Sequence, residues 1–112
     1  GLNRAVLAEG LEFAHAQGLN RSTALEVLQA GPAASQVMDT KGEKMIRSDF
    51  APQARLSQHL KDVRLIQAEG DLCGARLTLT DHHEQLLSAL EARGLGQLDN
   101  SAVIEAFRTA NP

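Results

Sequence analysis

The chain has 112 residues, of which 43% are hydrophobic and 22% charged, an ordinary balance for one folded domain with a modest core. A net charge of -3 and the absence of Trp and Tyr exclude the basic surface and the aromatic stacking platforms of nucleic-acid binders. No apolar run approaches the ~20 residues that cross a bilayer, and the single Cys73 excludes an intrachain disulfide framework. We therefore expect a cytoplasmic protein that binds neither nucleic acid nor membrane.

The first predicted helix begins at Leu2 and ends at Gly18. Its apolar residues recur at helical spacing, and glycine tolerates the left-handed backbone that commonly ends a helix. Asn3 is the only plausible cap near its start. Gly10 costs about 1 kcal/mol relative to alanine inside a helix, so we expect another helix to cross closely there.

Two shorter helices are predicted next, over residues 23–30 and 34–46. Asn20 or Ser22 can cap the former, and a Gly-Pro pair stops it. Gly42 weakens the middle of the latter. The short turn between the first two helices predicts antiparallel or steeply crossed neighbours.

The fourth predicted helix covers residues 53–73 and is the longest. Gly70 is a soft point in its interior, and Gly74 ends it. Residues 75–80 alternate briefly between polar and apolar, as a strand would, but one isolated strand cannot form a sheet. We therefore expect an extended connector there.

The last two predicted helices follow this connector. Asp81 begins a cap-x-x-Glu arrangement that satisfies free N–H groups, which predicts a helix from Asp81 to Gly94. Asp99 or Asn100 then caps a final helix that continues through Phe107. The sequence thus predicts an all-α fold of about six helices in a single domain over all 112 residues.

A polar cluster lies on the predicted fourth helix, beside its apolar stripe. Lys61 and Asp62 are neighbours, and Asp62 lies on the same side as Gln58, His59 and Arg55 at helical spacing. Such a cluster is either a binding face or an ordinary solvated surface. In the second case Asp62 simply pairs with Arg55 or His59, which contributes a few tenths of a kcal/mol.

Three stretches of the chain resemble the motifs of one protein family in order and spacing. They are Phe50-x-Pro52 with Lys61-Asp62-Val63-x-Leu65, Ala8-Glu9-Gly10-Leu11-Glu12-Phe13-Ala14 with Gly18-Leu19-Asn20, and Gly94-Leu95-Gly96 with Asp99-Asn100-Ser101-Ala102. The first is similar to the F-x-P-x-F and KDL-x-LA motifs of the β-hydroxyacid dehydrogenase family, which contains 3-hydroxyisobutyrate dehydrogenase. The others are similar to its AEAL-x-LA...GLD and G-x-G-x-x-D-x-SA motifs, so the resemblance covers nearly the whole chain.

This resemblance implies the C-terminal helical domain of a dehydrogenase that transfers a hydride between NAD or NADP and a small 3-hydroxy or 3-oxo acid. The family's dinucleotide-binding domain and its acid/base lysine would lie upstream of Gly1. No catalytic residue is then expected in this chain, which alone should be inactive. The resemblance also implies a homo-oligomer, a dimer or tetramer, in which this domain supplies part of the subunit interface and one wall of the active-site cleft.

The resemblance also assigns residues to that wall. Lys61 matches the family's lysine that reaches the nicotinamide cofactor, and Asp62 matches the aspartate that shapes the cleft. Ala54 stands where the family usually has an aromatic residue, so the pocket here would be wider or would admit Arg55 or His59. An arginine at this place would suit a substrate carboxylate.

Other residues carry weaker signals. His82 and His83 point about 100° apart on a helix and cannot form the i, i+4 clamp of a metal site, so we expect no metal. Cys73 is expected to be a buried small hydrophobe. Asp99 matches the family's closing motif, but a helix cap explains it sufficiently.

Two alternatives belong to other functional classes. One is a stand-alone helical module for dimerisation or protein binding, in which Lys61 and Asp62 are only surface residues. The other is a DNA-binding helix-turn-helix around residues 18–20. It ranks last because residues 22–30 contain Glu26 and no Lys or Arg, so the attraction to phosphate is missing.

Overall fold

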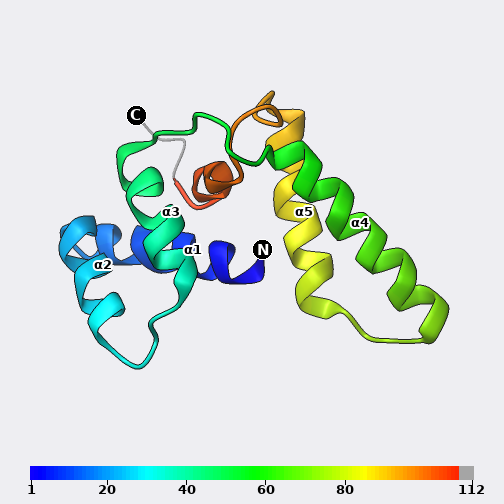
Figure 1. The fold of residues 1–112 in the computed structure, drawn as a ribbon, viewed down its shortest axis with the longest axis horizontal. Coiled ribbons are helices and arrows are strands. Elements are labelled where there is room, and N and C mark those ends of the chain that lie inside the picture. Colours follow the sequence, from blue (N-terminus) through cyan, green and yellow to red (C-terminus); the bar gives the residue numbers. More distant parts are fainter. Residues whose placement is uncertain (109–112) are drawn as a thin grey trace.

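The structure, a computed structural model, describes residues 1–108, and this part of the chain is entirely helical (Figure 1). The elements are α1 (Leu2–Ala16), α2 (Arg21–Ala30), α3 (Gln36–Arg47), α4 (Leu56–Cys73), α5 (Thr78–Ala92) and the 3-10 helix η1 (Asn100–Ala106). Within residues 1–108 the only β pairing is an isolated bridge between Arg55 and Asp99. The predicted all-α fold of six helices is confirmed. None of the described helices is long and apolar enough to span a membrane.

The short helix η1 is the centre of the arrangement. It contacts α1, α3, α4 and α5, whereas α2 contacts only α1 and α3. In Figure 1, α1, α2 and α3 form one half of the domain, and α4 and α5 form a hairpin that projects from the other half. The C-terminal segment therefore joins the two halves.

The core is aliphatic, as expected of a chain without Trp or Tyr. Its largest fully buried side chains come from five of the six helices and are Leu11, Met45, Leu56, Leu60, Leu87, Leu90, Val103 and Ile104. Phe50 and Phe107 pack against this core from its edge, whereas Phe13 is 66% exposed. The hydrophobic effect of this shared core is the main term that holds η1 against the hairpin.

Several predicted boundaries are wrong at helix starts. Asn3 lies inside α1, and the cap position belongs to Gly1. The predicted extended connector becomes helical at Thr78, so Asp81 is in the first turn of α5 and accepts a hydrogen bond from Gln67 instead of capping. The backbone groups of this stretch have no neighbouring strand to pair with, and helix formation satisfies them.

Other local predictions are confirmed. Asn20 caps α2 by accepting a hydrogen bond from the Thr23 N–H at 3.1 Å. Gly74 ends α4 in the left-handed conformation, with φ of 74°. Asp99 caps the last helix, which is a 3-10 helix rather than the α-helix that apolar spacing suggested.

The predicted starts at residues 34 and 53 are each two to three residues too early, since α3 and α4 begin at Gln36 and Leu56.

The two interior glycines of α1 and α3 differ in their surroundings. A Cβ placed on Gly10 would meet nothing within 4 Å, so the predicted close helix crossing there is wrong. A Cβ placed on Gly42 would lie 2.7 Å from Leu25 Cδ2. Because Leu25 is buried in the core, α2 can approach α3 closely only where α3 has no side chain.

We expect opposite effects of the same substitution at these two glycines. Gly10→Ala should raise the free energy of unfolding by roughly 0.5–1 kcal/mol, because alanine favours the helix and nothing obstructs it. Gly42→Ala should lower it by about 1–3 kcal/mol through overpacking against Leu25. Urea unfolding followed by circular dichroism measures both, and a stabilising Gly42→Ala would contradict the packing described here.

Candidate functional site

A buried ion pair between Lys41 of α3 and Asp99 lies beneath the polar segment that the sequence pointed to. The Lys41 Nζ lies 3.1 Å from Oδ1 and 3.0 Å from Oδ2 of Asp99. Asp99 is 0% exposed and Lys41 8% exposed. The carboxylate also accepts hydrogen bonds from the N–H groups of Gln53 and Ala54 at 3.0 and 3.1 Å, and from the Ser101 N–H and hydroxyl at 3.0 and 2.6 Å.

Backbone hydrogen bonds join the same two segments, residues 50–57 and 96–100. The N–H groups of Leu56 and Ser57 donate to the carbonyls of Leu98 and Gly96, each at 2.8 Å. In the other direction, two N–H groups of the second segment donate to carbonyls of the first, Asp99 to Phe50 at 2.9 Å and Asn100 to Ala54 at 2.7 Å. Two motifs that are about 40 residues apart in the sequence thus form one unit.

These contacts give Asp99 a carboxylate that stays ionised. Burial by itself raises the pKa of Asp99, but hydrogen bonds from Ser101 and the backbone of Gln53, together with Lys41, outweigh it and hold the pKa well below its usual range. The ionised group then fixes the loop between α3 and α4. Sequence reasoning gave Asp99 only the role of a cap.

Lys41 was missed altogether by the sequence analysis, although a signal was present. It lies three residues after Met38 and four before Met45, and both methionines are buried. A lysine at this spacing shares the apolar face of its helix, and a charge there requires a buried partner. Only the tertiary fold identifies that partner as Asp99.

The loop fixed by Asp99 lines a hollow of about 410 Å³. Its walls are formed by Pro52, Gln53, Ala54, Arg55 and Gln58. Ala54 and Arg55, which sequence analysis placed in a substrate pocket, therefore lie together at one hollow. Arg55 occupies the cap position of α4 in extended conformation, and its residue is exposed.

Lys61 and Asp62 lie nearly two turns further along α4 than Arg55, and both are exposed. Among residues 1–108, no hydrogen bond or ion pair joins Asp62 to Arg55 or His59. The expected pairing of Asp62 with Arg55 or His59 is therefore not found in this part of the chain. Lys61 and Asp62 are both exposed, as either a binding face or a solvated surface would have them.

His59 is separated from the other cluster members. Its ring faces that of His83, with centroids 5.2 Å apart, and both line a second hollow of about 310 Å³ with Gly1 and Thr80. Burial, followed by the positive charge of Arg4, lowers the pKa of His59 to about 4. The ring is thus neutral near pH 7, and its Nε2 is buried without a hydrogen-bond partner among the described residues.

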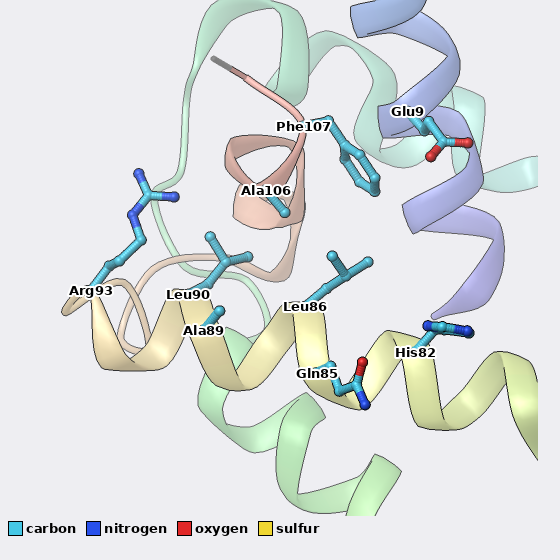
Figure 2. A pocket seen from close by; sticks show the side chains of 9 residues that line it. All are labelled: Glu9, His82, Gln85, Leu86, Ala89, Leu90, Arg93, Ala106 and Phe107. Atoms are coloured by element: carbon cyan, nitrogen blue, oxygen red, sulfur yellow. The ribbon is translucent and has the colours of Figure 1, made fainter. Parts of the chain in front are cut away.

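A third and larger hollow, of about 480 Å³, lies between α1, α5 and η1 (Figure 2). Its floor is apolar and includes Leu86, Leu90 and Phe107, and polar residues such as Glu9 and Arg93 stand around it. Sequence analysis gave no indication of this hollow. No cluster of three or more His, Cys, Asp or Glu within residues 1–108 is arranged to hold a metal ion.

Cys73 corrects a further prediction. It is exposed rather than buried, at the end of α4, where its Sγ lies 3.6 Å from the Gly70 carbonyl oxygen. The reason is that the helical hairpin projects from the domain, so its tip has no core to face. The buried small position near this tip is Gly70, which the Leu77 side chain covers.

Comparison with solved structures shows which fold the chain shares. The fold is similar to that of 3-hydroxyisobutyrate dehydrogenase from Salmonella typhimurium, with a TM-score of 0.90 over 95% of this chain and 37% of that one, at 21% identity. The chain thus has the fold of a helical part of a hydroxyacid dehydrogenase.

Sequence comparison then gives the family. Residues 1–107 match the family described as "NAD-binding of NADP-dependent 3-hydroxyisobutyrate dehydrogenase", and the chain belongs to it. It is 34% identical over 101 residues to glyoxylate/succinic semialdehyde reductase 1 of Arabidopsis thaliana, and the matched residues make up 90% of this chain and 35% of that protein. It is 30% identical over 106 residues to 2-hydroxy-3-oxopropionate reductase of Escherichia coli, and the matched residues make up 95% of this chain and 36% of that protein.

These matches confirm the family predicted from the three motifs and its nicotinamide cofactor, NAD or NADP. The chain spans about a third of the length of the two curated relatives. The family description makes NAD binding a property of the matched segment itself, although the sequence analysis placed the dinucleotide-binding domain upstream. A helical surface that contacts the cofactor is consistent with both the family description and an upstream dinucleotide-binding domain.

We expect Asp99 to make the domain sensitive to acid. Its folded pKa lies below the unfolded value of about 3.9, so its contribution to stability is complete above that value and is lost as the pH falls below it. Asp99→Asn should cost about 3–5 kcal/mol at pH 7, because it leaves Lys41 buried without its charge partner. The same substitution should flatten the fall of the unfolding free energy between pH 4 and pH 2, which urea titrations at a series of pH values measure.

The exposed Asp71→Asn is the matched control and should change neither quantity. Equal acid sensitivity of the native chain and Asp99→Asn would show that other groups cause it.

Proposed function

We propose that the chain is the C-terminal helical domain of an NAD(P)-dependent β-hydroxyacid dehydrogenase. The complete protein would transfer a hydride between the cofactor and a small 3-hydroxy acid or the matching 3-oxo acid. The observation that carries this proposal is the segment of residues 52–62, in which the buried Asp99 fixes the loop and Arg55, Lys61 and Asp62 are all exposed.

The names of the relatives support a small oxo acid as the substrate, and one of the named compounds, 2-hydroxy-3-oxopropionate, is a 3-oxo acid. Both are reductases of small oxo acids, glyoxylate and succinic semialdehyde in one case and 2-hydroxy-3-oxopropionate in the other. Each of these compounds carries a carboxylate and a reducible aldehyde group. A cationic donor such as Arg55 is the side chain that recognises a carboxylate with two parallel hydrogen bonds.

A second domain is part of this proposal. Dinucleotide-binding domains of the doubly wound type need parallel strands and a glycine-rich turn, and residues 1–108 contain neither. We place that domain, and the acid/base lysine, before Gly1. The helical surface around α4 would then close the cleft from the opposite side.

The exposed cations fit an anionic cofactor and substrate. The nicotinamide, when bound, accepts or donates the hydride. Lys61 would hold the cofactor through its ammonium group, Arg55 would bind the substrate carboxylate, and Asp62 would shape the cleft between them. His59 would line the cleft at the neighbouring hollow, where its neutral ring packs against that of His83.

The start of α4 is not a phosphate site, although helix N-termini often are. The N–H groups of Leu56 and Ser57 are already bound to the carbonyls of Leu98 and Gly96. Anion binding on this face therefore depends on side chains.

A homo-oligomer, a dimer or tetramer, is also proposed. The projecting hairpin of α4 and α5 exposes Leu65, Ile66, Leu72 and Leu79, which are 59%, 52%, 81% and 69% exposed. Apolar side chains of this size on one hairpin suit a subunit interface.

The proposal is tested by steady-state kinetics of the complete protein with a panel of small 3-hydroxy acids and both cofactors. We expect turnover with at least one acid, and Lys61→Ala should raise the KM for the cofactor about ten-fold or more, because a charge-assisted contact is lost. The 112-residue chain alone should be inactive.

Arg76→Ala is the matched control, since Arg76 is exposed in the connection between α4 and α5, beyond the far end of α4 from the segment. No turnover on the panel, a silent Lys61→Ala, or activity of the isolated chain would each count against the proposal.

Substrate recognition gives a separate expectation at the hollow beside Ala54. Arg55→Ala should raise the KM for the acid by about ten- to a hundred-fold and leave the KM for the cofactor unchanged, because only the carboxylate contact is removed. Ala54→Phe should fill part of the hollow and disfavour the longer acids of the panel over the shortest. An unchanged substrate KM in Arg55→Ala would remove Arg55 from the site.

A further inference from the structure

We infer that Lys41 and Asp99 are positioning residues for the substrate wall formed by Ala54 and Arg55. Neither touches the hollow, so each would act through the loop that it holds. The inference deepens the proposed function and rests on it.

The carboxylate of Asp99 has its acceptor capacity filled, which fixes its orientation. Oδ1 receives Lys41 and the N–H groups of Gln53 and Ala54, and Oδ2 receives Lys41 and two donors of Ser101. A carboxylate offers about four lone-pair sites, so little freedom is left. Two of the N–H groups that it anchors belong to residues lining the hollow.

Lys41 completes this anchor from a third element. It extends from α3, neutralises the buried carboxylate, and its Nζ lies 3.5 Å from the Gln53 Oε1. Without it, Asp99 would be an uncompensated buried charge that protonates or draws in water. The distance between α3 and the loop is thereby set by the reach of one side chain.

The anchor acts on a limited part of the chain. The Arg55 carbonyl already accepts the His59 N–H, and Leu56 and Leu60 are buried in the core, so α4 itself is held independently. Loss of the anchor would loosen residues 53–55, which the Asn100 N–H still holds through the Ala54 carbonyl, while the hairpin stays folded. The side chain of Arg55 would then lose its defined place at the edge of the hollow.

Trypsin cleavage after Arg55 reads the order of this loop directly in the complete protein, with cleavage after Arg76 as the internal reference. In Asp99→Asn and Lys41→Met, we expect the ratio of the two cleavage rates to rise about ten-fold, because a freed loop fits a protease better. The KM for the acid should rise by a similar factor, with a smaller change in kcat and in the cofactor KM. Lys41→Arg, which keeps the charge, should restore most of both.

Leu25→Ala is the control for a purely structural effect. It empties a buried position on α2, which contacts only α1 and α3, so it should lower stability without changing the cleavage ratio or the substrate KM. Ser101→Ala removes only the 2.6 Å hydrogen bond to Asp99. It should raise the cleavage ratio and the substrate KM by a smaller factor than Asp99→Asn does. This variant also tests the inference if Asp99→Asn does not fold.

The inference is overturned if the anchor variants behave like Leu25→Ala in both measurements. A native protein without turnover overturns the proposed function instead. In that case a raised cleavage ratio in Lys41→Met still supports an ordering role of the pair for this loop, and an unchanged ratio overturns it.

Discussion

The fold depends on a charge that is buried where three elements meet. Asp99 is completely enclosed, and a carboxylate in such a place is tolerated only when donors surround it. Lys41 of α3, the loop before α4 and the first turn of η1 supply those donors. The same group that caps η1 thus ties α3 to the loop before α4.

This constraint explains how a small aliphatic domain can present a defined polar face. The core of the domain positions α4 through Leu56, Leu60 and Val63, which leaves the opposite side of the helix free for Lys61 and Asp62. The loop before α4 has no core residues of its own between Ala51 and Arg55, and it is ordered by hydrogen bonds instead. A surface that must recognise a charged ligand gains from such an anchor, because preorganised groups lose less entropy on binding.

The family relation places this face in a wider context. The chain corresponds to about a third of its two curated relatives, and its surfaces include three hollows rather than one enclosed pocket. The His59 and His83 rings show a different use of polar residues, since burial keeps at least His59 neutral and makes it part of the packing.

By itself, the sequence determined the helical class, the family and the local signals at Asn20, Gly74 and Asp99, because spacing, capping and glycine geometry act within a few residues. It did not determine that Thr78 begins a helix, that Gly42 rather than Gly10 marks the close packing, or that Cys73 is exposed. The pairing of Lys41 with Asp99 spans 58 residues, and the division of the polar cluster between two hollows depends on which face of α4 meets the core. Such contacts follow from the packing of several elements at once, which no single stretch of sequence encodes.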